Sequence, residues 1–272
     1  MLVLMAVTLA LFAATGCDKL RARDQLNKGV QSYKNTRYEE AIQHFQNAVS
    51  LDPGLLNARL YLATALANQY IPGVDNEENN RIAQQAIDEF KKVLDTHPPK
   101  DRQITSLKGI ASLYFNMKKM EEAKQYHRKV TELDSNDPEA YYSIGVIDWT
   151  ESYQPRMEER AKLGLKPEQQ LNAKDKDQKK VCQTLKEKNW VSIQDGIENL
   201  NKALQLRPEY DDAMAYMNLL YREKADLECE DPAARAADLK TADEWVDKTM
   251  ATKKAKAEKQ PGAQGITMQP SQ

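Results

Sequence analysis

One amphipathic pattern recurs along the chain, and it constrains the fold more than any other feature. Its first copy is YEEAIQHFQNAVSLDP, residues 38–53. A small residue opens the pattern, apolar residues follow four and seven positions later on the same helical face, and a proline or a turn ends it. Repetition at a fixed spacing predicts a stack of similar helical units. The small residues that open the four copies are Ala41, Ala86, Ala123 and Gly196.

Upstream of each copy lies a second helical stretch, which also carries a small residue. A large side chain at this point would hold two crossing helices apart, at a cost of roughly 1–3 kcal/mol. Each unit is therefore predicted to be a helix–turn–helix hairpin that closes at small residues. The four predicted crossing residues are Gly29, Ala63, Ala111 and Gly145.

A helix–turn–helix repeat of about 34 residues resembles the tetratricopeptide-repeat (TPR) family. The resemblance covers about residues 22–250 and implies an all-α, right-handed superhelical solenoid. The fifth repeat is degenerate, with Asn218 where a small residue is expected, and its second helix is expected to cap the solenoid. The expected repeats are 22–55, 56–100, 104–137, 138–210 and 211–250.

Three repeats carry extra residues between their two helices, at about 71–80, 150–189 and 228–232. Equivalent turns of a solenoid stack along one edge, so these insertions are expected to project from the same side. In the insertion at 150–189, Pro155 and Pro167 bracket a charged stretch, and a lysine-rich helix is predicted to follow to about Lys188, so the insertion is expected to be a helical arm. It is interpreted either as a contact arm for acidic protein or anionic lipid, or as a solvated helical flap.

Two cysteines fall in these insertions, Cys182 in the arm and Cys229 in the fifth-repeat turn. Turns that share an edge could bring the thiols together, and an exported protein enters an oxidising compartment. A disulfide here would stabilise the fold by roughly 4 kcal/mol on the chain-entropy model. The alternative is two unrelated free cysteines.

The N-terminus resembles a bacterial lipoprotein signal. Residues 1–14 carry no charge and are too short for a membrane span, which needs ~20 residues. The sequence Ala14-Thr15-Gly16-Cys17 is similar to a lipoprotein cleavage box, although Leu is usual at the first position and no basic residue precedes the apolar run. The resemblance implies a signal peptide at 1–16, lipidation of Cys17 and a tether at 17–21. An uncleaved anchor, or a secretory signal with an incidental cysteine, are the alternatives.

Charge and motif content argue against nucleic-acid binding and catalysis. The 41 acidic and 39 basic residues nearly cancel, whereas nucleic-acid binders are usually basic. His44, His97 and His127 lack metal-ligand spacing, and no phosphate loop, GxSxG or HExxH motif occurs. We therefore expect no catalytic residue, no metal and no cofactor, and a protein that is not an enzyme.

The family resemblance implies that the first helices line a concave groove that takes a peptide or a helix. Leu26 and Val30 replace the Lys and Asn with which some TPR domains clamp acidic tails, so the predicted groove is apolar and aromatic. The alternatives are that these side chains pack on the neighbouring repeat, or that the insertion covers Trp149. The predicted groove residues are Leu26, Val30, Tyr33, Leu60, Thr64, Asn68, Lys108, Ser112, Phe115, Asn116, Tyr142, Val146 and Trp149.

These features favour a non-catalytic protein–protein interaction scaffold, lipid-anchored at the bacterial cell envelope and facing the periplasm. The plan of a lipobox followed by TPR repeats is similar to that of lipidated TPR adaptors that assist envelope assembly. A structural protein that self-associates through its ends and edge loops is the alternative. Residues 251–272 are expected to be a flexible tail, because the composition changes to Pro, Gly and Gln.

Overall fold

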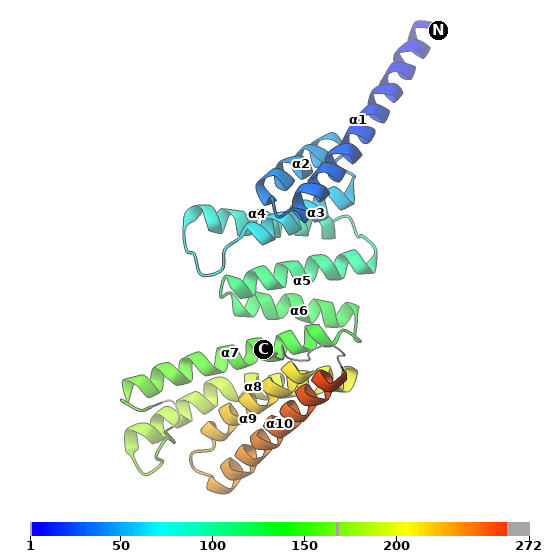
Figure 1. Cartoon of the computed structure of the whole chain (residues 1–272). Helices are drawn as coiled ribbons and strands as arrows, with labels where there is room; N and C mark the ends of the chain where they lie inside the picture. The colour runs from blue at the N-terminus through cyan, green and yellow to red at the C-terminus, as the bar shows by residue number, and fades with distance from the viewer. Residues whose placement is uncertain (1, 167–168, 260–272) are drawn as a thin grey trace, which may run out of the picture. The chain divides into compact units, whose positions relative to one another are not determined.

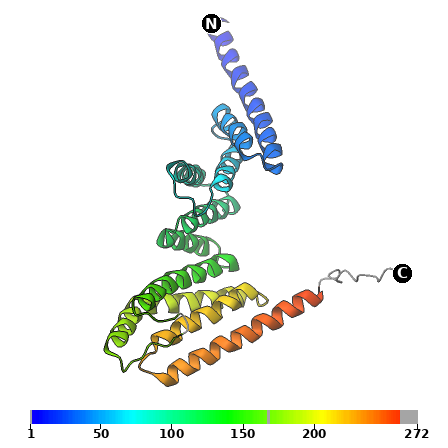
Figure 2. The ribbon, with the colours of Figure 1, turned by 60° about the vertical axis from the view of Figure 1, so that its left-hand side comes forward.

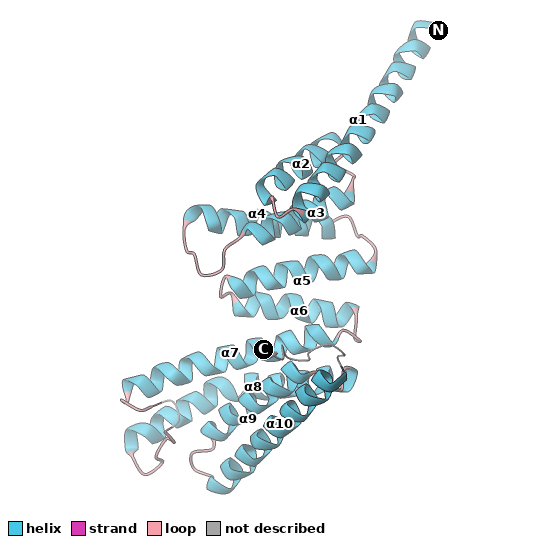
Figure 3. Ribbon diagram, in the orientation of Figure 1, coloured by secondary structure: helices cyan, strands magenta, loops and turns pink. Residues whose placement is uncertain are grey.

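The computed structural model describes residues 2–166 and 169–259, and these contain ten α-helices and no strand (Figures 1 and 3). The predicted all-α fold is therefore confirmed. Met1, residues 167–168 and residues 260–272 lie outside this description. The helices are α1 (Leu2–Lys34), α2 (Tyr38–Leu51), α3 (Leu56–Gln69), α4 (Glu77–Leu94), α5 (Lys100–Asn116), α6 (Met120–Leu133), α7 (Pro138–Lys162), α8 (Lys176–Leu206), α9 (Asp211–Leu227) and α10 (Pro232–Lys259).

Consecutive helices pair as antiparallel hairpins, one for each predicted repeat. The chain divides into two compact units, residues 1–134 and residues 135–272, called here the first unit and the second unit. The first unit holds the hairpins α1/α2, α3/α4 and α5/α6. The second unit holds α7/α8 and α9/α10, and Figure 2 shows α9 and α10 running side by side in opposite directions.

The predicted crossing residues lie buried where the two helices of a hairpin meet. A Cβ atom at Gly29 would stand 2.5 Å from the ring of Phe45, and one at Gly145 would stand 2.5 Å from Cγ of Leu200. Only glycine leaves room for these side chains at the crossing. The crossing residues of the other two hairpins, also fully buried, are Ala63 and Ala111.

The insertion of repeat two is shorter as a loop than the sequence suggested. The Asn76 side chain accepts a hydrogen bond from the Asn79 backbone N–H at 2.8 Å and caps α4, which therefore begins at Glu77. Residues 70–76 connect α3 to α4 and are called here the edge loop. Residues 77–80, expected in the loop, form the first turn of α4.

The insertion of repeat four contains the predicted lysine-rich helix, at the start of α8, but it does not form a separate arm. Helix α7 continues through Pro155 to Lys162, and α8 already begins at Lys176, so the insertion lengthens both helices of one hairpin. Pro155 removes one backbone donor, yet the buried side chains of Ser152, Arg156 and Arg160 keep the helical spacing of four on one face. Packing of that face outweighs the proline, which therefore does not bracket a separate segment. Pro167 lies outside the described residues.

Both ends of the described chain are more helical than expected. Residues 17–21, predicted to be a tether, continue α1, where Arg21 approaches Asp18 at 3.8 Å. Residues 251–259, predicted to belong to a flexible tail, continue α10, because this Ala- and Lys-rich stretch favours helix and Lys259 pairs with Glu209 at 2.8 Å. No helix among the described residues is long and apolar enough to cross a membrane.

Candidate interaction surfaces

The predicted groove residues lie on the first helices of their hairpins, and each keeps some of its surface exposed. None of the thirteen is buried, and Asn68 and Ser112 are exposed. In the first unit, Asn68 on α3 donates a hydrogen bond to the hydroxyl of Tyr33 on α1, so adjacent first helices bring two of these residues together. Leu26, Val30 and Leu60 also pack against the hydrophobic core, as the packing alternative predicted.

The cavities of the first unit lie at the turns that join the two helices of a hairpin. An open cavity of about 530 Å³ is lined by the α1–α2 turn and the end of α3. A second cavity, of about 490 Å³, lies between the edge loop and the α5–α6 turn. Among the predicted groove residues, only Asn68 lines the former and only Asn116 lines the latter. The hollows in this unit therefore follow the edge that carries the turns.

In the second unit, aromatic rings form a continuous series along the seam between α7 and α9, called here the aromatic ladder. The ladder begins with Tyr142, whose ring centroid lies 4.9 Å from that of Tyr210 and 5.7 Å from that of Tyr216. Tyr216 continues the ladder to Trp149 at 5.5 Å, and Trp149 stacks on Tyr153 at 4.9 Å. Such contacts add about 0.5–1.5 kcal/mol each beyond the buried area.

The ladder shows that Tyr142 and Trp149 pack on the neighbouring repeat as well as facing outward. Burial raises the pKa of the Tyr142 phenol well above its ordinary value, and burial raises the pKa of Tyr210 to about 12. The indole N–H of Trp149 is buried without a hydrogen-bond partner. Tyr153 belongs to the insertion, so one residue of the insertion contacts Trp149.

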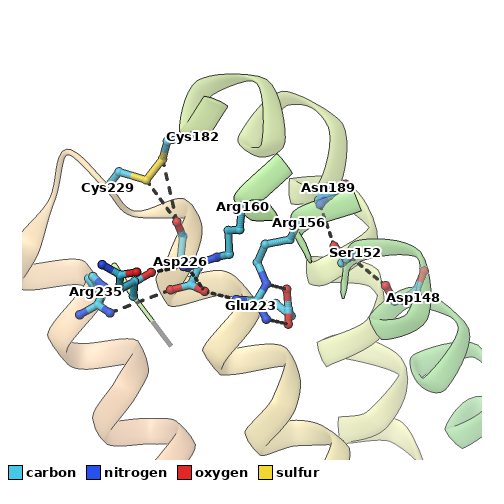
Figure 4. Close-up of polar contacts among 11 residues, drawn as sticks. Asp148, Ser152, Arg156, Arg160, Cys182, Asn189, Glu223, Asp226, Cys229 and Arg235 are labelled. Carbon is cyan, nitrogen blue, oxygen red and sulfur yellow. Dashed lines mark hydrogen bonds and ion pairs between the residues drawn. A yellow bond between two sulfur atoms is a disulfide. The ribbon is translucent and has the colours of Figure 1, made fainter. Parts of the chain in front are cut away.

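Beside the ladder lies a cluster of buried charges that joins α7 to α9 (Figure 4). The guanidinium of Arg156 contacts Glu223 at 2.7 Å and Asp226 at 2.5 Å, and Arg160 contacts Asp226 at 2.7 Å. Arg235 approaches the other oxygen of Asp226 at 3.9 Å. Arg160 is only 1% exposed, so the insertion contributes a buried cation to the core of this unit. These five residues are called here the charge cluster.

Glu223 lies in an environment that resists ionisation. Burial raises its pKa to about 7, while the contact with Arg156 opposes the shift and the nearby Asp226 carboxylate adds to it. The Arg156 guanidinium also lies over the ring of Tyr153, 5.4 Å from its centroid. The charge cluster is thus in direct contact with one end of the aromatic ladder.

The two cysteines of the insertions are joined as a disulfide in the structure. Cys182 and Cys229 have Cα atoms 6.5 Å apart, within the range that a disulfide spans. The sulfur of Cys229 lies 3.2 Å from the backbone oxygen of Asp226, next to the charge cluster (Figure 4). The α7–α8 and α9–α10 turns of the second unit therefore share one edge, as the repeat pattern predicted.

Part of the basic surface expected on the insertion is paired within the protein. Lys186 contacts Glu228 at 2.8 Å, and Lys179 pairs with Glu230, so acidic residues of the α9–α10 turn neutralise both lysines. Their contacts fasten α8 to that turn. This arrangement favours a structural role for the insertion over a contact arm for anionic partners.

The histidines occupy structural or surface positions in the first unit. His44 bonds to Gln25 at 2.8 Å, the ring of His97 lies 3.1 Å from the Asp95 backbone oxygen, and His127 is buried on α6. Within the described ranges, no group of His, Cys, Asp and Glu residues could hold a metal ion.

Sequence reasoning missed the charge cluster and the aromatic ladder. The signal for the cluster was present, since Arg156 and Arg160 lie four residues apart and Glu223 and Asp226 lie three apart, on one face of each helix. This spacing did not identify the cluster, because charged residues with the same spacing are also typical of an exposed polar helix face. The link that Tyr216 makes between two predicted groove residues, Tyr142 and Trp149, appears only in the structure.

Comparison with known proteins supports the fold. Residues 109–137 match the family model described as "Tetratricopeptide repeat". A crystal structure of MamA protein is similar over 89% of this chain and 97% of that chain, with a TM-score of 0.56 and 15% identity. A second similar structure, MamA from residue 41 onward from Desulfovibrio magneticus RS-1, covers 86% of this chain and 96% of that chain, with a TM-score of 0.55 and 17% identity.

No curated protein sequence matches the chain. At these identities the two structures establish the fold alone. The chain is therefore an all-helical protein with the fold of a TPR solenoid, and a recognisable tetratricopeptide repeat lies at residues 109–137.

Proposed function

We propose that the protein is a non-catalytic interaction scaffold that binds a peptide or a helix of another protein along its first helices. The observation that carries this proposal is that none of the thirteen predicted groove residues is buried, although their helices supply much of the core. Half-exposed aromatic side chains held rigidly by their neighbours are effective anchors, because little side-chain entropy remains to be lost on binding. The aromatic ladder meets this description.

We further propose that the scaffold is an adaptor, lipid-anchored through Cys17 and facing the periplasm. Cys17 is exposed, and the disulfide between Cys182 and Cys229 suits an oxidising compartment. Metabolic labelling with an alkyne fatty acid tests the anchor. Label should be incorporated into the native chain and lost in Cys17→Ala, and equal labelling of both chains would contradict the proposal.

Photocrosslinking in cells tests the binding surface. The photoreactive residue is placed at Ser112 on α5 or at Val146 on α7, which are predicted groove positions in different units. The control positions are Gln125 on α6 and Val191 on α8, both exposed on second helices. One discrete protein captured from both first-helix positions and not from the controls is the expected result. Equal capture from all four positions would refute binding along the first helices.

Self-association through the edge loops is a second candidate, favoured by one observation. Ile71 and Val74 of the edge loop are 59% and 38% exposed, although both are large apolar residues. Light scattering across a concentration series separates the two functions. Oligomers that disappear in Ile71→Ser with Val74→Ser would favour self-association, whereas a monomer at all concentrations would exclude it.

A further inference from the structure

The cavity between the edge loop and the α5–α6 turn has a rigid wall. Asn79, only 5% exposed, uses its side chain to hold the loop: its amide group donates to the backbone oxygens of Ile71 and Val74 at 2.8 and 2.7 Å. Its side-chain oxygen accepts from the Ile71 N–H at 2.9 Å. A loop with its polar backbone groups satisfied in this way is a preformed surface, and it costs little entropy to use in binding.

The opposite wall carries two lysines on the α5–α6 turn. Lys118 has φ of 59°, a backbone conformation that favours glycine, and its N–H bonds to the Phe115 oxygen at 2.9 Å. Lys119 follows, with its N–H on the Tyr114 oxygen at 2.8 Å. Thr36 of the α1–α2 turn has the same φ of 59°, so this conformation ends the first helix of both hairpins.

The residues that line the cavity are of three kinds: charged, amide and apolar. The lining contains these two lysines and a single carboxylate, Asp75, which already accepts a hydrogen bond from Asn80 at 2.9 Å. The remaining lining supplies side-chain amides and an apolar surface, from Tyr70, Val74, Gln84, Asn116 and Met117. The cavity therefore offers cations, one acceptor and an apolar wall within about 490 Å³.

We propose that this cavity binds the C-terminal end of a partner polypeptide whose last residue is apolar. The terminal carboxylate lies against Lys118 and Lys119, the N–H of the last residue donates to Asp75, and its side chain rests on Val74 and Met117. A chain end carries an anion, a donor and a side chain on one Cα atom, which matches the three parts of the lining. A Glu or Asp side chain offers only the anion.

The first cavity provides an internal comparison at the equivalent turn. Its lining includes Arg37, Glu39 and Glu40, and Arg37 is already paired with Glu40 at 3.0 Å. One cation and two carboxylates make it unfavourable for a carboxylate. The same probe should therefore discriminate between two cavities of similar size and position in the fold.

The proposal deepens the proposed function by naming a second kind of contact, and it is tested on the purified full chain with short probes. Nuclear magnetic resonance follows the Met117 methyl and the Asn116 side-chain amide during titration with N-acetyl-Leu-Leu. Saturable shifts in the millimolar range are expected, and the C-terminal amide of the same dipeptide should bind about tenfold more weakly. Asn68, in the first cavity, should not shift.

Two variants keep the test independent of folding. Lys118→Gly relieves the left-handed backbone while it removes a cation, so it should fold at least as well and bind about tenfold more weakly. Lys119→Ala should weaken binding similarly, and Lys34→Ala, an exposed lysine beside the α1–α2 turn, is the matched control. Absence of saturable shifts, or unchanged affinity in Lys118→Gly, would overturn the proposal.

Two further probes separate the sources of the anion. N-acetyl-glutamate amide binding as well as the dipeptide would overturn the assignment to a chain end in favour of a side chain. Free leucine binding more tightly than the dipeptide would overturn it in favour of a small-molecule site. The titration uses no partner from the cell, so its failure does not affect the crosslinking test of the proposed function. Failure of the crosslinking likewise does not affect the titration.

Discussion

The two units are built from the same hairpin but are fastened in different ways. The first unit is held together by close apolar packing, for example of Gly29 against Phe45, and cavities lie at its turns. The second unit adds a disulfide and the charge cluster, and its insertion lengthens α7 and α8. The insertion therefore changes how a repeat is held together while its surface remains available.

The tryptophans make this comparison easy to measure. All three, Trp149, Trp190 and Trp245, lie in the second unit. Tryptophan fluorescence therefore follows the unfolding of the second unit alone, whereas far-ultraviolet circular dichroism follows both.

The largest effect is expected from Arg156→Ala. The substitution leaves Glu223 buried without the cation that contacts it at 2.7 Å, and breaking a buried pair in this way costs about 3–5 kcal/mol. Urea unfolding followed by tryptophan fluorescence should show this loss. The first-unit pair of Arg59 and Glu89, at 2.7 Å but more exposed, is the matched control. Arg59→Ala should cost about 1 kcal/mol or less, measured by circular dichroism because the first unit contains no tryptophan. Equal losses would remove the distinction.

Removal of the disulfide should have the next largest effect. Cys182→Ser with Cys229→Ser releases a loop closed over a separation of 47 residues, and such losses are typically about 2–4 kcal/mol. The fluorescence-detected midpoint should decrease, and Cys17→Ser should leave it unchanged. A midpoint that reductant does not affect would show that the disulfide does not fasten this unit.

The crossing glycines should give similar losses in both units. Gly29→Ala and Gly145→Ala each place a Cβ atom 2.5 Å from a buried side chain, and relief of such overpacking costs about 1–3 kcal/mol. The loss should appear in fluorescence only for Gly145→Ala and in circular dichroism for both. Gly73→Ala tests a site without contact within 4 Å, where only the backbone φ of 82° opposes the change.

The smallest effect is a pH dependence confined to the second unit, which contains no histidine. The pKa of Glu223 is about 7 in the folded chain against an ordinary value of 4.5, so the folded state holds the proton more tightly. Stability is greatest below the unfolded pKa and decreases as pH rises from about 5 to 7, by on the order of 1–2 kcal/mol. In Glu223→Gln the fluorescence-detected stability should be flat over this range.

The repeat pattern was sufficient to predict the hairpins because each position in it has one local physical cause. Gly145 is required by the approach of Leu200, and a proline or turn ends each second helix. The path of the insertion was not predictable in this way. Pro155 reads locally as a helix end, and only the burial of Arg156 and Arg160 against α9 explains why the helix continues.

The predicted groove residues show the same difference between local and long-range causes. Position within a repeat correctly selected residues on first helices, since the alternation of buried and exposed faces is local. It did not identify the contacts of Trp149 with Tyr216 and Tyr153, because those depend on the neighbouring repeat and on the insertion. The cavities at the turns depend on pairs of connections, and a single repeat does not contain that information.

Native-state hydrogen exchange measured against denaturant tests most directly the claim that the two units are fastened differently. In the oxidised full chain, amides of α7 to α9 should open with a free energy about 2–4 kcal/mol above those of α1 to α6, because the disulfide restricts the unfolded second unit. Equal opening free energies for the two units, or a second unit that opens first, would contradict the account.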